Sequence, residues 1–204
     1  AWPAGPITED TLAYFRGDAD FRNYVLLELP HAAGLVLAAG GERDWAVSLV
    51  RNFFYSALMV GVWERLQHSA DAHLAAIAAK SLKEVRYHLR HSRDWLVRLG
   101  DGTPESHRRA QAAVDYLLPF TEEFWSTSAL EAEALDQGTG VDVPALRAAW
   151  NQTVDEALLE ATLTRPADTK RYVPEGKRGV HSEHLGYLLG EMQSLARQHP
   201  GAIW

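Results

Sequence analysis

Residues 72–99, AHLAAIAAKSLKEVRYHLRHSRDWLVRL, form the longest uninterrupted stretch of helical periodicity in the chain. Apolar residues recur in it at three- and four-residue steps, which is the pattern of one buried helix face. Asp71 stands where a carboxylate can cap the first turn, and Gly100 stands where a left-handed residue can end the helix. The pattern predicts one long amphipathic helix whose apolar stripe consists of Leu74, Ala78, Leu82, Val85, Leu89, Leu96 and Leu99.

The rest of the chain also favours helices, separated by turns rich in glycine, proline and aspartate. Thr8 is a candidate helix start, a glycine-containing loop is expected over 30–41, and Thr103 with Pro104 makes a strong helix start. No stretch alternates for long enough to predict a strand. We therefore predict an all-α antiparallel helical bundle, forming a single domain over 1–204, with further helices at 18–29, 42–67, 105–118 (with a kinked continuation through Pro119 to about 135 as the alternative), 144–163 and 180–198, and with an irregular connector over 164–179.

Composition narrows the possible functions. The chain has 204 residues, 47% of them hydrophobic, no cysteine and a net charge of −7. These values favour a globular protein, give no electrostatic basis for binding nucleic acid, and exclude disulfides and thiolate metal sites. The longest apolar run, from Phe53 to Trp63, is shorter than a membrane span needs, and the start lacks a signal peptide. We expect a cytoplasmic protein without a membrane partner, although a chain that begins at Ala1 need not begin at its native start.

One segment of the long helix resembles a damaged metal site. Carboxylate-bridged di-iron centres place a Glu three residues before a His, so that both side chains reach one metal ion. Here Val85 stands three residues before His88, while Glu84 is four before it and rotated by about 100°. On a helical wheel Val85 lies near the centre of the apolar stripe, and Glu84 and His91 lie at its boundary with solvent. We expect a vestigial site converted to packing. His88 is expected to flank the core, paired with Glu84 at the surface or with a neighbouring helix, and Glu84, His88 and His91 are only weak metal candidates.

A second histidine cluster, His181-Ser182-Glu183-His184, lies at the expected start of the last helix. His181 and His184 are three apart and are predicted to share a helix face, which leaves a weak zinc pair as one interpretation. The favoured interpretation is a helix start that contains a partly buried histidine. No nucleophile elbow or phosphate loop is present, so no catalytic residue is predicted.

The large aromatic residues divide into two groups. Trp45, Phe53 and Trp63 recur at helical spacing and are predicted to lie in the core. Trp95, Trp125 and Trp150 fit a core or an interface equally well, since large amphipathic rings are common in both. The terminal Trp204 follows Ile203, and such an apolar tail is expected to dock on this chain or on a partner. The interface candidates are therefore Trp95, Trp125 and Trp204.

Several blocks of sequence resemble the structural, or C, subunit of the phenylacetyl-CoA 1,2-epoxidases. They are AKSLKEVRYH at 79–88, WLVRLGDGT at 95–103, HSEHLGY at 181–187 with EMQ at 191–193, PGAIW at 200–204, and the shorter FRN at 21–23 and ELP at 28–30. The resemblance implies a ferritin-like fold and a structural role beside a related catalytic subunit. That partner is expected to hold the di-iron centre and to bind phenylacetyl-CoA, and the system further includes a reductase and a small bridging subunit. No cofactor is expected in this chain.

The resemblance also makes two residue-level predictions. The matching helix of the catalytic partner reads Lys-Glu-Glu-x-Phe-His, so Val85 replaces the ligand Glu and His88 corresponds to the metal-bound His. Family members generally have two further helices before this segment, and without them the face of Leu74, Leu82 and Val85 is expected to be partly uncovered. We therefore expect a non-catalytic subunit of an enzyme that epoxidises an aromatic ring with oxygen and NADPH. The alternatives are a divergent di-iron oxygenase active on its own and a helical adaptor that binds other proteins.

Overall fold

The computed structural model describes residues 8, 10–30, 44–167 and 174–202. The described residues form helices and turns without a strand, so the predicted all-α class is confirmed. They divide into two compact units, one made of residues 1–30 and 174–204 and the other of residues 31–173. The prediction of a single domain over 1–204 remains a prediction. The loop expected over 30–41 and the terminal Trp204 lie outside the described residues, apart from Pro30.

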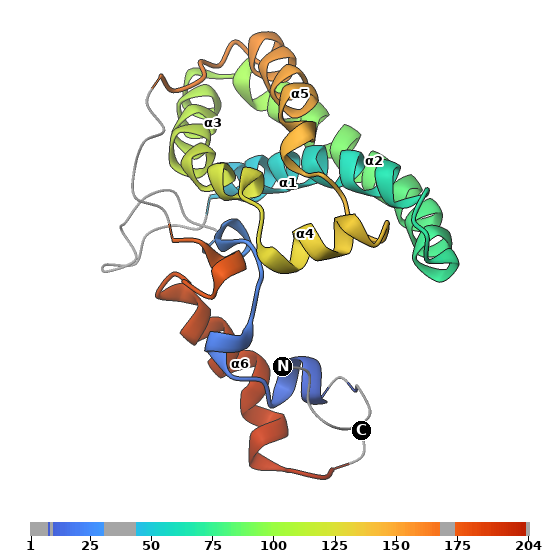
Figure 1. The fold of residues 1–204 in the computed structure, drawn as a ribbon. Coiled ribbons are helices and arrows are strands. Elements are labelled where there is room, and N and C mark those ends of the chain that lie inside the picture. Colours follow the sequence, from blue (N-terminus) through green and yellow to red (C-terminus); the bar gives the residue numbers. More distant parts are fainter. Residues whose placement is uncertain (1–7, 9, 31–43, 168–173, 203–204) are drawn as a thin grey trace. The chain divides into compact units, whose positions relative to one another are not determined.

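The larger unit is built around two long helices. α1 spans Trp45–Leu66 and α2 spans Ala72–Gly100, and a short turn lets α2 return alongside α1 (Figure 1). α3 (Pro104–Leu117) and α5 (Arg147–Glu160) both pack against this pair. A 3₁₀ segment (Leu118–Trp125), the short α4 (Ala129–Asp136) and a 3₁₀ turn (Pro144–Leu146) connect α3 to α5.

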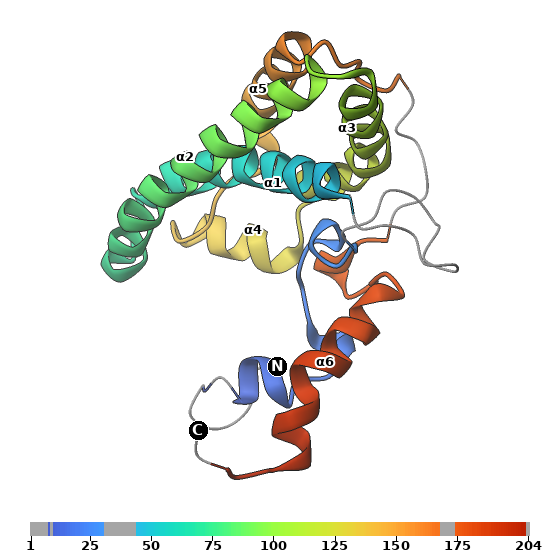
Figure 2. The same ribbon diagram turned by 180° about the vertical axis from the view of Figure 1, so that it is seen from behind.

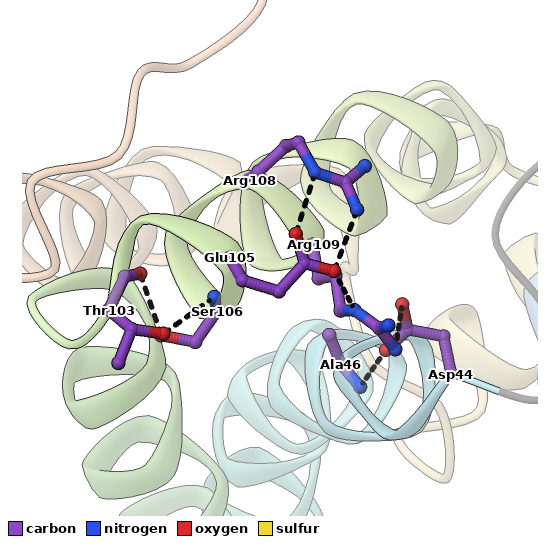
Figure 3. Close-up of polar contacts among 7 residues, drawn as sticks. All are labelled: Asp44, Ala46, Thr103, Glu105, Ser106, Arg108 and Arg109. Carbon is purple, nitrogen blue, oxygen red and sulfur yellow. Dashed lines mark hydrogen bonds and ion pairs between the residues drawn. The ribbon is translucent and has the colours of Figure 1, made fainter.

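Side-chain caps set the starts of these helices. The Asp44 side chain accepts a hydrogen bond from the backbone N–H of Ala46 at the start of α1, and Asp71 does the same for His73 and Leu74 at the start of α2. Thr103 accepts from the N–H of Ser106 at the start of α3, as Figure 3 shows beside the Asp44 cap. The predicted caps at Asp71 and Thr103 are therefore confirmed, and α2 ends within one residue of its predicted limit.

The core of the larger unit is apolar and aromatic. Trp150 is buried, and its indole N–H donates to the Phe54 carbonyl at 3.0 Å, which ties α5 to α1. Phe53 is buried as predicted, but Trp45 is 51% exposed and lies edge-on against Trp95, so its predicted core position is wrong. The reason is that Trp45 is the first residue of α1, where the apolar periodicity continues but the neighbouring helices cover the ring only in part. The largest fully buried side chains of this unit are Val47, Val50, Phe53, Phe54, Leu58, Leu96, Leu117, Leu118, Phe124 and Leu158.

A glycine lets the end of α2 approach the end of α5 closely. A Cβ atom placed on Gly100 would stand 2.1 Å from the carbonyl oxygen of Ala161. The Gly100 carbonyl lies 2.8 Å from His107 Nδ1 and accepts from the Thr162 hydroxyl at 3.2 Å. Thr162 itself has a φ of 57°, which is costly for a β-branched residue. The helix predicted over 144–163 therefore ends earlier than expected: α5 stops at Glu160, and Thr162 is no longer helical.

The helix expected over 105–118 is found as α3, whereas the alternative continuation to about 135 is broken into separate pieces. α3 ends at Leu117 because Pro119 has no amide hydrogen for the next helical bond, and the chain tightens into the 3₁₀ segment. Ser128 then starts α4 through a capping box with Glu131. The helix over 105–118 is therefore confirmed, and its kinked continuation to about 135 is wrong.

The smaller unit contains only one regular helix among its described residues, α6 (His184–Gln198). It is accompanied by a π-type turn (Asp10–Tyr14) and three 3₁₀ turns (Asp18–Asp20, Val25–Leu27 and Gly176–Arg178). The predicted helix over 18–29 is wrong, since Phe21 and Tyr24 are extended, and α6 begins four residues after the predicted Val180. Figure 2 shows the N-terminal turn beside α6 within this unit, in agreement with their direct contacts.

One expectation about apolar segments needs correction. α1 has 22 residues and, by length and composition alone, is apolar enough to cross a membrane. The apolar segment of the chain is therefore longer than the run from Phe53 to Trp63 on which the sequence expectation was based. Core helices pass the same test, and the buried face of α1 packs against α2, α3 and α5.

Candidate functional site

The suspected metal position borders a groove between α1 and α2. Glu84, Val85 and His88 line it together with Ser81 of α2. Its volume is about 340 Å³, and its α1 wall consists of Asn52, Tyr55, Ser56, Met59 and Trp63. The two walls thus follow the three- and four-residue spacing of single helix faces. The groove brings together the residues that the sequence singled out around His88, but sets them among apolar and neutral polar side chains.

Val85 lies in line with the buried residues of α2 and yet is only half-buried. Leu82 and Ser92, one and two turns away, are buried. Leu74 is also half-buried, so the face of Leu74, Leu82 and Val85 is covered only in part. A second hollow between α1 and α2, beside Leu89, is covered differently. It is bordered by Leu146 and by residues of α5, whereas the groove beside Val85 is lined by α1 and α2 alone. The position that a di-iron site would use is therefore an open groove rather than a closed core.

The polar residues of the groove do not form the predicted surface pair. Glu84 and His88 are both exposed, and within the described residues the structure places no hydrogen bond or ion pair between them. His88 and His91 instead flank the exposed Tyr87 ring, with centroid distances of 5.8 Å and 6.0 Å. Their neighbour Arg86 pairs with Glu64 of α1 at 2.8 Å. This face of α2 is a solvated helix surface with an aromatic cluster.

The groove does not fit a di-iron centre. Such a centre needs several carboxylates and histidines directed at the same point, and Val85 contributes only hydrocarbon where a ligand would stand. Among the residues that the structure describes, no group of three or more His, Asp or Glu side chains could hold a metal ion. Glu84, His88 and His91 therefore lack the further ligands that a metal pair would require.

The second histidine cluster has a different architecture from the predicted one. His181 precedes α6, and its Nδ1 lies 2.6 Å from Glu28 Oε1 while its Nε2 lies 3.1 Å from the Phe21 carbonyl. Ser182 donates to Glu28 Oε2 from both its backbone N–H and its hydroxyl, each at 2.8 Å. His184 is the first residue of α6 and does not share a helix face with His181. A partly buried histidine near the helix start is found, but its partner is a carboxylate.

Glu28 is the residue that sequence reasoning overlooked. Its side chain is only 1% exposed and also accepts from Asn23 Nδ2 at 2.8 Å, which gives the carboxylate four donors. A signal existed, because Glu28 interrupts the apolar run from Val25 to Leu29, and a carboxylate within such a run is buried only when it is paired.

Two of the three aromatic interface candidates belong to the described residues, and each packs against other rings. Trp95 is half-buried, packs edge-on against Trp45 and has the Arg98 guanidinium 5.3 Å above its ring. Trp125 is half-buried against Phe124 and Trp150, with ring centroids 5.8 Å and 5.4 Å away. Both rings therefore complete intramolecular clusters while keeping one side accessible. Their role in an interface remains a prediction.

These features define an all-α protein of the bundle class, with a hydrocarbon side chain, Val85, three residues before His88 in a groove between two helices. Comparison with known proteins gives the family. The model of the phenylacetic acid catabolic protein family matches residues 4–204, and the chain belongs to that family, with its ferritin-like helical fold. A relative in Escherichia coli (strain K12), the C subunit of 1,2-phenylacetyl-CoA epoxidase, is 41% identical over 201 residues, which cover 98% of this chain and 76% of the relative.

Proposed function

We propose that this chain is the non-catalytic structural subunit of a multicomponent phenylacetyl-CoA 1,2-epoxidase. The observation that carries the proposal is the 41% identity to the E. coli epoxidase subunit over nearly the whole chain. The family's role in phenylacetic acid catabolism agrees with it. The name of the relative also implies further components, because a protein named as one subunit belongs to an assembly.

The geometry at Val85 supports a helper role over a catalytic one. A di-iron oxygenase activates oxygen at a metal pair held by carboxylates and histidines on facing helices. In the described residues the facing wall on α1 offers Asn52, Tyr55, Ser56, Met59 and Trp63, none of which is a carboxylate or a histidine. The di-iron centre of the complex therefore belongs, in this proposal, to a separate catalytic subunit. This chain stabilises that partner through helix-to-helix contact, the assembly also includes a reductase and a bridging subunit, and the complex works in the cytoplasm.

A reconstitution experiment tests the proposal. The purified chain is analysed for iron and then mixed with the separately purified di-iron subunit, and complex formation is followed by size-exclusion chromatography with light scattering. We expect less than about a tenth of an iron per isolated chain and a stable complex with the di-iron subunit. Stoichiometric iron with a di-iron absorbance in the isolated chain would overturn the non-catalytic role.

Turnover separates the proposal from the alternatives. We expect epoxidation only when this chain is combined with the reductase and the di-iron subunit, and we expect His88→Ala to leave that activity within about twofold. The matched control is removal of one iron-binding Glu from the di-iron subunit, which should abolish activity. Turnover by the isolated chain that is lost in His88→Ala would establish a divergent oxygenase instead. Failure to associate with the di-iron subunit would favour a helical adaptor for other proteins.

A further inference from the structure

The N-terminal part of the smaller unit is held to α6 mainly by polar side chains. Gln193 is buried in α6, and its Nε2 donates to the carbonyls of Ala13 at 2.6 Å and Arg16 at 2.8 Å. Arg197, one turn later, donates to the carbonyls of Tyr14 and Arg16, each at 3.3 Å. Side chains of α6 therefore satisfy backbone groups that a helix or sheet would otherwise pair. We call residues 10–20 the strap.

The strap buries little apolar surface of its own. Leu12, Tyr14 and Phe15 are its large apolar side chains, and each is more than a third exposed. The buried side chains of α6 are Leu185, Leu189, Gln193 and Ala196. Because burial of apolar side chains is the main stabilising contribution in most segments, a strap held largely by hydrogen bonds to carbonyls opens at a low free energy.

The packing between strap and α6 is also incomplete. A hollow of about 350 Å³ lies between them, lined on the strap by Gly17 and Asp18 and on α6 by Gly186, Leu189, Gly190, Gln193, Ser194 and Arg197. A Cβ atom placed on Gly186 or Gly190 would meet nothing within 4 Å. Lifting the strap therefore breaks few van der Waals contacts on this side of α6.

The segment that follows the strap is fastened much more firmly. Val25, Leu26 and Leu29 are buried, and the Glu28 carboxylate accepts from Asn23, His181 and Ser182. Both ring nitrogens of His181 face acceptors, Glu28 Oε1 and the Phe21 carbonyl, so the ring donates to both only when it carries two protons. We call residues 23–29 with His181 and Ser182 the latch. Removing one member of such a buried pair leaves the other uncompensated, which makes the latch costly to open.

We propose that the strap lifts off α6 as a local opening, with the latch still closed. The open state uncovers Leu189 and Gln193 next to Tyr187, Leu188 and Leu195, which are already exposed on α6. The smaller unit thus has two states, which differ in how much of α6 is accessible. The proposal is independent of the proposed function, since it concerns only contacts within this unit.

The absence of cysteine from the sequence makes a thiol-labelling test direct. Leu189→Cys places a thiol beneath the strap, Leu26→Cys places one in the latch, and Ser194→Cys provides an exposed reference on α6. Ala157→Cys, in the core of the larger unit, reports opening of that unit. We expect the Leu189→Cys thiol to be labelled at least tenfold more slowly than Ser194→Cys and at least tenfold faster than both Leu26→Cys and Ala157→Cys.

Two further substitutions, each combined with the cysteine variants, distinguish opening of the strap from opening of the latch. Gln193→Leu removes the donors to Ala13 and Arg16 and should speed labelling of Leu189→Cys at least tenfold, without affecting Leu26→Cys. Glu28→Gln should speed labelling of Leu26→Cys and leave Ala157→Cys unchanged. Equal labelling of Leu189→Cys and Ser194→Cys would show that the strap is not seated, and equal labelling of Leu189→Cys and Leu26→Cys would show that it does not open alone. Either result overturns the proposal.

Hydrogen exchange of the unmodified chain provides a check that needs no core substitution. Peptides covering residues 10–20 should exchange at least tenfold faster than those covering 24–29, yet more slowly than an unstructured peptide of the same sequence. Equal protection of the two segments, or no protection of residues 10–20, contradicts opening of the strap alone, even where a cysteine variant fails to fold.

Discussion

The two compact units of this chain are stabilised in different ways. The larger unit buries helix faces against one another, and its most deeply buried side chains, such as Phe53, Phe54 and Leu96, are hydrocarbon. The smaller unit has one regular helix in its described part, and it buries the carboxylate of Glu28 among side-chain and backbone donors. Apolar packing keeps most of its stabilising effect when side chains move slightly, whereas a buried carboxylate becomes unfavourable when any of its hydrogen-bond donors is lost. The smaller unit should therefore be the more sensitive to single polar substitutions.

The largest expected effect comes from Glu28→Ala. The substitution leaves His181, Ser182 and Asn23 without their shared acceptor in a buried site, and breaking such a pair costs about 4 kcal/mol. Hydrogen exchange should show loss of protection in residues 24–29 and at the start of α6, with α1 and α2 unaffected. Glu191→Ala, on the exposed face of α6, is the matched control and should change little. Equal loss of protection in both units would show that they unfold together.

Two glycines provide a matched pair for the same comparison. A Cβ atom on Gly100 would stand 2.1 Å from the Ala161 carbonyl oxygen, and one on Gly176 would stand 2.1 Å from the Asn23 carbonyl oxygen. Each replacement by alanine forces backbone apart and should destabilise its own unit by about 3 kcal/mol. Calorimetry combined with hydrogen exchange would assign each loss to a unit.

Gly186→Ala is the control for these two glycines. Its Cβ atom meets nothing within 4 Å, and alanine favours the helix by up to about 1 kcal/mol, so α6 should gain stability. If Gly100→Ala proves as harmless as Gly186→Ala, the close approach of α2 to the end of α5 does not exist in solution.

The same contrast explains which parts of the fold could be predicted from sequence. Helical periodicity located α1 and α2 to within a few residues, because their apolar faces are what the other helices pack on. The region around Glu28 could not be predicted in this way. Its turns are set by hydrogen bonds to His181 and Ser182, more than 150 positions along the chain, and local propensity carries no information about such partners.

The candidate site shows a similar limit. The wheel correctly placed Val85 in line with the buried face of α2, but whether a residue on that face is covered depends on the neighbouring helices. The groove beside Val85 and the exposed position of His88 therefore required the structure. Trp45 was wrongly predicted to lie in the core for the same reason. The apolar periodicity continues to the end of α1, but the neighbouring helices do not cover that end completely.

A smaller effect is expected at the start of α2. Asp71→Ala removes the oxygen that accepts from the N–H groups of His73 and Leu74, and the loss of such a cap costs about 1 kcal/mol. Urea denaturation should show this loss in the larger unit alone. Asp71→Asn retains an acceptor and should recover most of the stability, whereas equal loss in both variants would assign the effect to the charge.

The smallest effect concerns Glu105, an exposed residue at the start of α3. Arg108 and Arg109 donate to its carboxylate at distances of 2.7–3.0 Å, and Arg109 also approaches Asp44 of the α1 cap (Figure 3). Hydrogen bonds from these two guanidinium groups lower the pKa of Glu105 to about 2. Because the folded-state pKa is depressed, the contribution is complete above the ordinary glutamate pKa of about 4.3 and is lost as the pH falls toward 2.

Titration of the Glu105 carboxyl carbon by NMR would measure this shift directly. We expect a midpoint near 2 in the unmodified chain. In the double variant Arg108→Gln/Arg109→Gln the midpoint should return to about 4.3, the ordinary glutamate value. The single variants should fall between, with Arg108→Gln closer to the ordinary value because Arg108 makes two of the three hydrogen bonds. A midpoint near 4 in the unmodified chain would mean that solvent separates these charges.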